Sequence, residues 1–171
     1  MRDGIEWREL CRNQAGVVTL VQARALGWTR HAVAAQVAAG RWTRLHRNVY
    51  ASFTGELSYE QRLWAGLLYA GRNAVASHQS ALWLFDRQRP EPEKVHLTVP
   101  RMRDAVRGPG LRVYRSDLSP HEKLDLASPP RVRLERAVLE CAAAAQKVDD
   151  AIAIVAEAIQ RRMTTAERLC E

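Results

Sequence analysis

The amino-acid sequence predicts an α+β protein of two parts, a small helical part with a β-hairpin over residues 1–56 and a mixed α/β domain over residues 57–171. Three observations lead to this prediction. Three short helical patterns and one hairpin pattern come before residue 56, and longer helices with β-rich segments follow them. The 171 residues, 47% of them hydrophobic, are enough for one ordinary domain or two small ones with real cores.

The first 40 residues carry the signals of three short helices. We expect helices over residues 5–14, 20–26 and 30–39, with a β-prone triplet at residues 17–19. Thr19 and Thr29 each precede a helical pattern, where a side-chain oxygen can accept a hydrogen bond from an unpaired N–H group of the first turn. Gly40 follows the third pattern, at the position where helices commonly end in a left-handed conformation.

A basic hairpin pattern comes next. Over residues 41–53 apolar residues nearly alternate with basic and polar ones, and Arg47-Asn48 suits a turn. Three helices followed by a basic hairpin are the layout of a winged helix-turn-helix, in which the third helix enters the major groove of DNA and the hairpin, the wing, touches the backbone. The sequence therefore predicts an N-terminal winged helix-turn-helix followed by a mixed α/β domain.

The second part begins with an amphipathic helix over residues 58–71, where Ser58 and Gln61 have the spacing of a capping box. We expect further helices over residues 74–85, 131–146 and 148–161, strands over residues 95–99, 111–114 and 124–127, and a last capped fragment from Thr164. A turn rich in Arg, Gly and Pro joins the first two strands.

Positive charge is concentrated in the predicted winged helix. The net charge is +7, and residues 10–55 contain six arginines and no acidic residue. Such a segment favours a polyanion as partner. A second and weaker basic cluster consists of Arg101, Arg103, Arg107, Arg112 and Arg115. We expect this cluster either to extend a DNA footprint or to be a solvated loop.

The predicted third helix presents a small and weakly polar outer face. If Val33 faces the core, a step of about 100° per residue places His31, Ala34, Ala35 and Ala38 on the opposite face. That face suits contact with thymine methyl groups but offers few hydrogen-bonding groups, so affinity would come from arginines that neutralise phosphates. We expect the DNA-binding residues to be Arg24, Thr29, Arg30, His31, Ala34, Ala35, Arg41, Arg44 and Arg47.

Two features of this segment have a second interpretation. The arginines would form an ordinary solvated surface if the winged helix were a protein–protein module. Trp28, Trp42 and Tyr50 either stack on bases or belong to the core, and aromatic residues at hairpin spacing are more typical of a core.

Several segments together resemble a known family. They are AGVVTLVQARALGWTRHAVAAQVAAGRWTRLHRNVYAS, SYEQRLWAGLLYAGRNAVASHQSALWLFD, KVHLTVPR, LRVYRSDL and LASPPRVRLERAVLECA, spread over residues 10–145. The most specific combination is GRW-x-RLHR-x-VY (residues 40–50) with AVASHQSA (residues 74–81). With these segments the chain resembles the AbiEi-type antitoxin and transcriptional-regulator family.

The resemblance implies a cytoplasmic, sequence-specific repressor that binds double-stranded DNA at the promoter of its own operon. It also implies the antitoxin of a type IV toxin–antitoxin system, paired with a nucleotidyltransferase-like toxin that is encoded nearby and does not form a stable complex. In the family the second domain helps in both DNA binding and antitoxin action. Many relatives look Arg-rich on the outer face of the third helix, where this chain has Ala34, Ala35 and Ala38. The basic wing of this chain therefore resembles the family more closely than its third helix does.

The resemblance also frames the alternatives. Some relatives continue into a Vsr-like endonuclease domain, whereas this sequence ends at Glu171, so we expect no enzyme activity. One alternative is the DNA-targeting part of a longer nuclease. The other is a protein–protein interaction module with a nonspecific basic head.

The spacing of the polar residues gives little support for a catalytic site or a metal site. Ser77 and His78 are neighbours that point about 100° apart on a helix and lack a G-x-S-x-G context, so we expect Ser77 to be a cap and His78 to be a packing residue. The spacing of His and Cys residues predicts neither a metal site nor a disulfide framework, and we expect no cofactor. A charged start and the lack of any long apolar stretch favour the cytoplasm, with no membrane contact.

Overall fold

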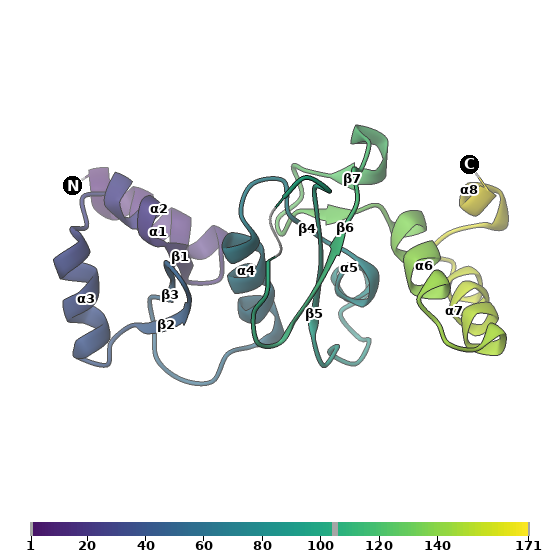
Figure 1. Cartoon of the computed structure of the whole chain (residues 1–171), viewed down its shortest axis with the longest axis horizontal. Helices are drawn as coiled ribbons and strands as arrows, with labels where there is room; N and C mark the ends of the chain where they lie inside the picture. Colours follow the sequence, from purple (N-terminus) through teal and green to yellow (C-terminus); the bar gives the residue numbers. More distant parts are fainter. Residues whose placement is uncertain (1, 104–105, 171) are drawn as a thin grey trace. The chain divides into compact units, whose positions relative to one another are not determined.

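The computed structural model describes residues 2–103 and 106–170, and these divide into two compact units. The N-terminal unit contains residues 1–74 and the C-terminal unit contains residues 75–171. Each unit has its own sheet and its own buried core (Figure 1). None of the described helices is long and apolar enough to cross a membrane.

The N-terminal unit follows the predicted order of elements. Its elements are α1 (Arg2–Asn13), β1 (Val17–Thr19), α2 (Leu20–Ala25), α3 (Arg30–Ala38), β2 (Thr43–His46), β3 (Val49–Ala51) and α4 (Tyr59–Ala70). The strands form an antiparallel sheet in the order β1-β3-β2, so β3 lies between the strand after the first helix and its hairpin partner. This order, with the two-stranded hairpin directly after α3, is consistent with a winged helix.

The predicted starts of α2 and α3 are confirmed by their capping contacts, whereas α1 begins at Arg2, before the predicted residue 5. The Thr19 hydroxyl oxygen accepts a 3.1 Å hydrogen bond from the backbone N–H of Gln22, and the Gln22 side chain accepts one of 2.9 Å from the backbone N–H of Thr19. Thr29 accepts a 3.0 Å bond from the N–H of Ala32 and begins α3. Gly40 follows α3 with φ +66°, the left-handed conformation that only glycine adopts without strain.

A cluster of aromatic rings forms the centre of the N-terminal unit. The Trp7 and Trp42 rings stack with centroids 5.4 Å apart, and Trp28 lies 5.0 Å from Trp42 and 5.3 Å from Trp7. Tyr50 lies 6.5 Å from Trp42, and Val33 of α3 is buried in the same cluster. These rings join α1, the α2–α3 connection and the hairpin, so they belong to the core and the alternative of base stacking is not supported for Trp42.

Helix α4 belongs to the N-terminal unit by its contacts. Ser58 and Gln61 form the predicted capping box, and Gln61 Nε2 donates a 3.4 Å hydrogen bond to the backbone carbonyl of Ala15. The helix packs against all three strands of the small sheet. The compact units therefore divide after Ala74, and the functional boundary between residues 56 and 57 stays a prediction.

The C-terminal unit is a five-stranded mixed sheet with helices. Its elements are β4 (Val75–Ala76), α5 (His78–Phe85), β5 (Val95–Val99), β6 (Leu111–Arg115), a 3-10 turn η1 (Pro120–Glu122), β7 (Lys123–Leu124), β8 (Arg131–Val132), α6 (Leu134–Ala143), α7 (Val148–Gln160) and α8 (Ala166–Cys170). The strand order is β6-β5-β4-β8-β7. β5 and β6 run parallel, as do β4 and β8, while the other two pairs are antiparallel.

Several boundaries predicted for this unit are wrong. Residues 74–85 are not one helix, because Val75 and Ala76 form β4 before α5 begins. The strands predicted at residues 95–99 and 111–114 are confirmed as β5 and β6, and the structure adds that they pair in parallel. The strand predicted at 124–127 is β7, which ends at Leu124, and the helix predicted from residue 131 begins only at Leu134, after β8.

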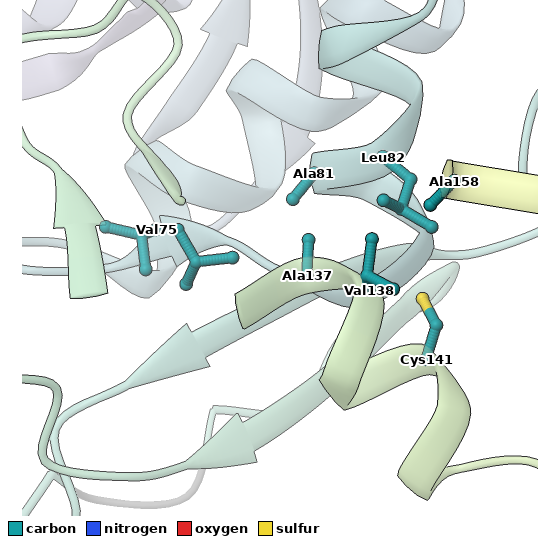
Figure 2. Packing of buried hydrophobic residues seen from close by; sticks show 8 residues of the cluster. Val75, Ala81, Leu82, Ala137, Val138, Cys141 and Ala158 are labelled. Atoms are coloured by element: carbon teal, nitrogen blue, oxygen red, sulfur yellow. The ribbon is translucent and has the colours of Figure 1, made fainter. Parts of the chain in front are cut away.

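The core of the C-terminal unit lies between α5 and α6. Figure 2 shows Ala81 and Leu82 of α5 facing Ala137 and Val138 of α6, and Ala158 of α7 belongs to the same buried cluster. Small residues at these positions let the helices approach closely. This packing fixes the N-terminus of α5, where Ser77 and His78 lie.

Candidate nucleic-acid interface

Helix α3 is positioned by one buried residue. Val33 is 1% exposed and packs in a cluster with Val18 of β1, Ala23 of α2 and Trp42 at the start of the hairpin. Because one helical turn is 3.6 residues, this contact fixes which side chains point outward. His31, Ala34, Ala35 and Ala38 are exposed, as the helical spacing predicts, and Arg30 at the start of the helix is exposed as well. The structure thus presents the expected small face on the outside of α3.

The hairpin presents its basic residues outward as well. Val49 and Ala51 of β3 are buried, whereas Arg44 of β2 and Arg47 at the turn are exposed. Asn48 forms the turn with φ +61°, a conformation that asparagine tolerates better than most residues. Asn48 is exposed and adds a hydrogen-bonding group to the tip, a position that reasoning from charge alone overlooks.

The nine predicted DNA-binding residues all lie on the surface of the N-terminal unit. They are Arg24 at the end of α2, Thr29, Arg30, His31, Ala34 and Ala35 on or before α3, and Arg41, Arg44 and Arg47 on the hairpin segment. Thr29 has a structural role besides, since it caps α3. Apart from Arg24 on α2, the residues lie on or next to α3 and on the hairpin segment that follows it.

The arginines of this surface have no ion-pair partner among the described side chains. Among the residues whose side chains are described, no carboxylate lies within 4.0 Å of the guanidinium groups of Arg24, Arg30, Arg41, Arg44 and Arg47. Two of them make other contacts. Arg41 Nε donates to the side-chain oxygen of Gln36 over 2.6 Å, and Arg44 Nε donates to the carbonyl of His46 over 3.4 Å. Both guanidinium groups keep further N–H donors with which to bind phosphate.

His46 belongs to the internal contacts of the hairpin. Its ring stacks on Tyr69 of α4 with centroids 4.6 Å apart and planes 17° apart. Partial burial lowers the pKa of His46 below its ordinary value, so this ring is neutral at physiological pH. His31 is therefore the histidine of this unit that stands on the exposed face of α3.

The second basic cluster lies in the C-terminal unit. Arg107, Arg112 and Arg115 line a hollow of about 380 Å³ beside β6, and the backbone N–H of Arg101 donates to Asp117 over 3.0 Å. These residues are in a different compact unit from the α3 surface. Whether the cluster extends a DNA footprint stays an open prediction.

Comparison with known proteins agrees with the resemblance seen in the sequence. Residues 8–52 match the family model described as "Transcriptional regulator, AbiEi antitoxin". The matched segment contains α2, α3 and the hairpin, and with them all nine predicted DNA-binding residues. No curated protein matches the chain. The resemblance inferred from the sequence is thus confirmed over residues 8–52, where the chain is similar to the AbiEi family of antitoxin transcriptional regulators.

Proposed function

We propose that this protein is a sequence-specific repressor that binds double-stranded DNA at the promoter of its own operon. The observation that carries the proposal is the set of five exposed arginines without carboxylate partners among the described side chains, all on α2, α3 and the hairpin. Such a positively charged surface suits the negatively charged phosphate backbone of DNA. The family match over the same residues supports this interpretation.

The hairpin and the outer face of α3 have different roles in this proposal, because their side chains have different chemistry. Arg44 and Arg47 on the hairpin bind phosphates, which supplies affinity and sets the register of the protein on the duplex. The outer face of α3 contacts base edges, where Ala34 and Ala35 pack against thymine methyl groups and His31 supplies the hydrogen-bonding group. Repression follows because a protein held on the promoter excludes the polymerase.

The antitoxin role is the second half of the proposal. We infer that the protein acts in a type IV toxin–antitoxin system, with a nucleotidyltransferase-like toxin from a neighbouring gene and no stable complex between the two proteins. The family description supports this role. Its test is a growth assay in which the neighbouring gene is expressed with and without this protein. Rescue of growth supports the role, and toxicity that this protein does not relieve contradicts it.

Fluorescence anisotropy tests the repressor proposal. A labelled duplex from immediately upstream of the gene is compared with a shuffled duplex of equal length at two salt concentrations. We expect tighter binding to the upstream duplex that persists at the higher salt, because base contacts are less salt-dependent than phosphate contacts. Equal and strongly salt-dependent binding to both duplexes would instead indicate a nonspecific basic head.

A further inference from the structure

A hollow in the C-terminal unit is not used by the proposed DNA-binding function. It has a volume of about 290 Å³ and is lined by residues from α5, β5, β6, α6 and α7. This volume lies at the lower end of the range for small-molecule sites. The hollow has a polar wall, an apolar wall and a guanidinium group, and each constrains what can bind there.

The polar wall is made of three stacked or hydrogen-bonded rings. The Tyr114 ring of β6 stacks on the His78 ring of α5, with centroids 3.6 Å apart and planes 11° apart. The Tyr114 hydroxyl lies 3.2 Å from Nδ1 of His96 on β5. His78 and His96 are only 8% and 7% exposed, so the three rings form a rigid wall.

His78 is held in an uncommon backbone conformation. Its φ is +49°, and its backbone N–H donates to Oε2 of Glu140 over 3.2 Å while its Nδ1 lies 3.3 Å from the same oxygen. Arg136 in turn holds Glu140 through a 2.9 Å ion pair. Because of this conformation His78 Nδ1 also lies 3.1 Å from the Ser77 hydroxyl, so the expectation that the two side chains point apart is wrong. Ser77 occupies the cap position but makes no capping hydrogen bond with its side chain.

Both imidazole rings are neutral at physiological pH. Burial lowers the pKa of His78 and of His96 to about 4, and the nearby Arg112 adds to the effect at each ring. The Nδ1 atom of His78 lies between the Glu140 carboxylate at 3.3 Å and the Ser77 hydroxyl at 3.1 Å. The wall therefore presents hydrogen-bonding rings without adding a positive charge of its own.

The charge of the hollow comes from Arg112. Its guanidinium lies 5.7 Å from the centre of the Tyr114 ring, and among the described side chains it has no carboxylate partner within 4.0 Å. Arg89, which also lines the hollow, is paired with Glu157 over 2.9 Å. The acidic residue of the lining, Asp150, is exposed to solvent at the start of α7. Arg112 is thus the cation available to an incoming anion.

The opposite wall is apolar. Leu82 of α5, Cys141 and Ala144 at the end of α6, and Ile154 of α7 line it. Burial raises the pKa of the Cys141 thiol to about 12, so this sulfur is a protonated packing group and no nucleophile. An inorganic anion would leave this wall uncovered, whereas an organic molecule would bury part of it.

We propose that this hollow binds a small organic anion whose carboxylate or phosphate group pairs with the Arg112 guanidinium and whose apolar body packs against Leu82 and Ile154. The Tyr114 hydroxyl and the imidazole of His96 supply further hydrogen bonds. An exposed guanidinium that has no carboxylate partner among the described side chains and lies beside an apolar wall is the arrangement that recognises such a molecule. The proposal goes beyond the proposed repressor function and does not depend on DNA binding.

Residue-resolved NMR of the full chain tests this site. The probes are benzoate and phenyl phosphate, with benzamide as an uncharged analogue and inorganic phosphate as an anion without an apolar body. We expect benzoate or phenyl phosphate to shift the amide signals of residues 78–82, 96 and 112–114 saturably. Benzamide and inorganic phosphate should bind more weakly, because each lacks one of the two features that the hollow recognises.

Two variants separate the site from general charge effects. Arg112→Gln should weaken binding of the bound probe about tenfold or more, since a charged hydrogen bond is lost. Arg115→Gln removes the same charge from the same strand, but Arg115 is not among the residues that line this hollow, so binding should be unchanged. If neither organic anion binds saturably, if both variants weaken binding equally, or if the shifts fall only within residues 1–74, the proposal is overturned.

Discussion

Arg41 and Gln36 join the end of α3 to the segment that leads into the hairpin. Arg41 Nε donates to the Gln36 side-chain oxygen over 2.6 Å, and the backbone N–H groups of Arg41 and Trp42 both donate to the Gln36 carbonyl, over 3.0 and 3.2 Å. Both parts of the proposed DNA surface are therefore fixed to one residue at the last turn of α3. A base-reading helix and a phosphate-binding hairpin need such a fixed spacing, because the two parts must reach the duplex together.

Charge reversal on the hairpin should weaken binding to every duplex. In the double variant Arg44→Glu with Arg47→Glu, we expect a lower affinity for both upstream and shuffled DNA, and a salt slope that falls by about one per lost phosphate contact. The control is Arg8→Glu with Arg12→Glu, which changes the net charge equally on exposed positions of α1. Anisotropy titrations at several salt concentrations give the slopes. An identical change in both double variants would contradict the assignment of the hairpin.

Removal of the imidazole from α3 should change sequence preference rather than general affinity. For His31→Ala we expect the ratio of affinities for upstream and shuffled DNA to fall by about fivefold to a hundredfold, the loss typical of one base contact. The salt slope should stay constant, because no phosphate contact is removed. Competition binding with both duplexes measures the ratio. Equal loss of affinity on the two duplexes would show that His31 does not read bases.

Two glycine substitutions should differ in their cost although both remove a left-handed glycine. Gly16 and Gly40 have φ values of +80° and +66°, so alanine costs about 1 kcal/mol of unfolding free energy at either position. A Cβ at Gly16 would also lie 2.8 Å from the Phe53 ring, whereas one at Gly40 meets no atom within 4 Å. We therefore expect Gly16→Ala to destabilise the N-terminal unit by about 1–3 kcal/mol more than Gly40→Ala. Urea unfolding followed by tryptophan emission measures both, and equal midpoints would contradict the close contact.

Acid should destabilise the C-terminal unit in a defined pH window. His78 and His96 have pKa values of about 4 in the folded protein, against 6.5 for an unperturbed histidine. Between these values the unfolded chain binds protons that the folded chain does not, so the free energy of unfolding should fall as the pH falls from about 6.5 to about 4 and change little from this source below that. NMR titration of the imidazole Cε1–H signals checks whether the pKa values of His78 and His96 are lowered in the folded protein. Midpoints near 6.5 for both rings would contradict it.

The sequence predicts the N-terminal unit well because its signals are local. Thr19, Thr29 and Gly40 each act within a few residues, and capping residues and left-handed glycines are readable at that distance. The outer face of α3 follows from helical spacing once Val33 is placed inside. The residues of the candidate DNA surface were therefore predictable from the sequence. Whether carboxylates pair with its arginines was not predictable, because ion pairs depend on which side chains the fold brings together.

The C-terminal unit was predicted less well because its decisive contacts are distant in sequence. The two residues of β4 lie within an apolar run, where a short strand cannot be told from a helix by spacing alone. The parallel pairing of β5 with β6 leaves no mark on the residues between them. His78 takes its left-handed conformation from Glu140, which lies 62 residues further along the chain. No pattern around the SHQS segment signals that contact.

The aromatic cluster of the N-terminal unit also provides an intrinsic spectroscopic signal for the packing of this unit. Trp7 and Trp42 are nearly parallel, at 11°, and their centroids are 5.4 Å apart, close enough for their excited states to couple and give a distinctive near-ultraviolet circular dichroism band. Four of the five tryptophans lie in this unit, and only Trp83 lies in the other. Because Trp42 and Val33 of α3 belong to the same buried cluster, the spectrum reports whether α3, the proposed DNA-contacting helix, is packed in place, without any label on the protein.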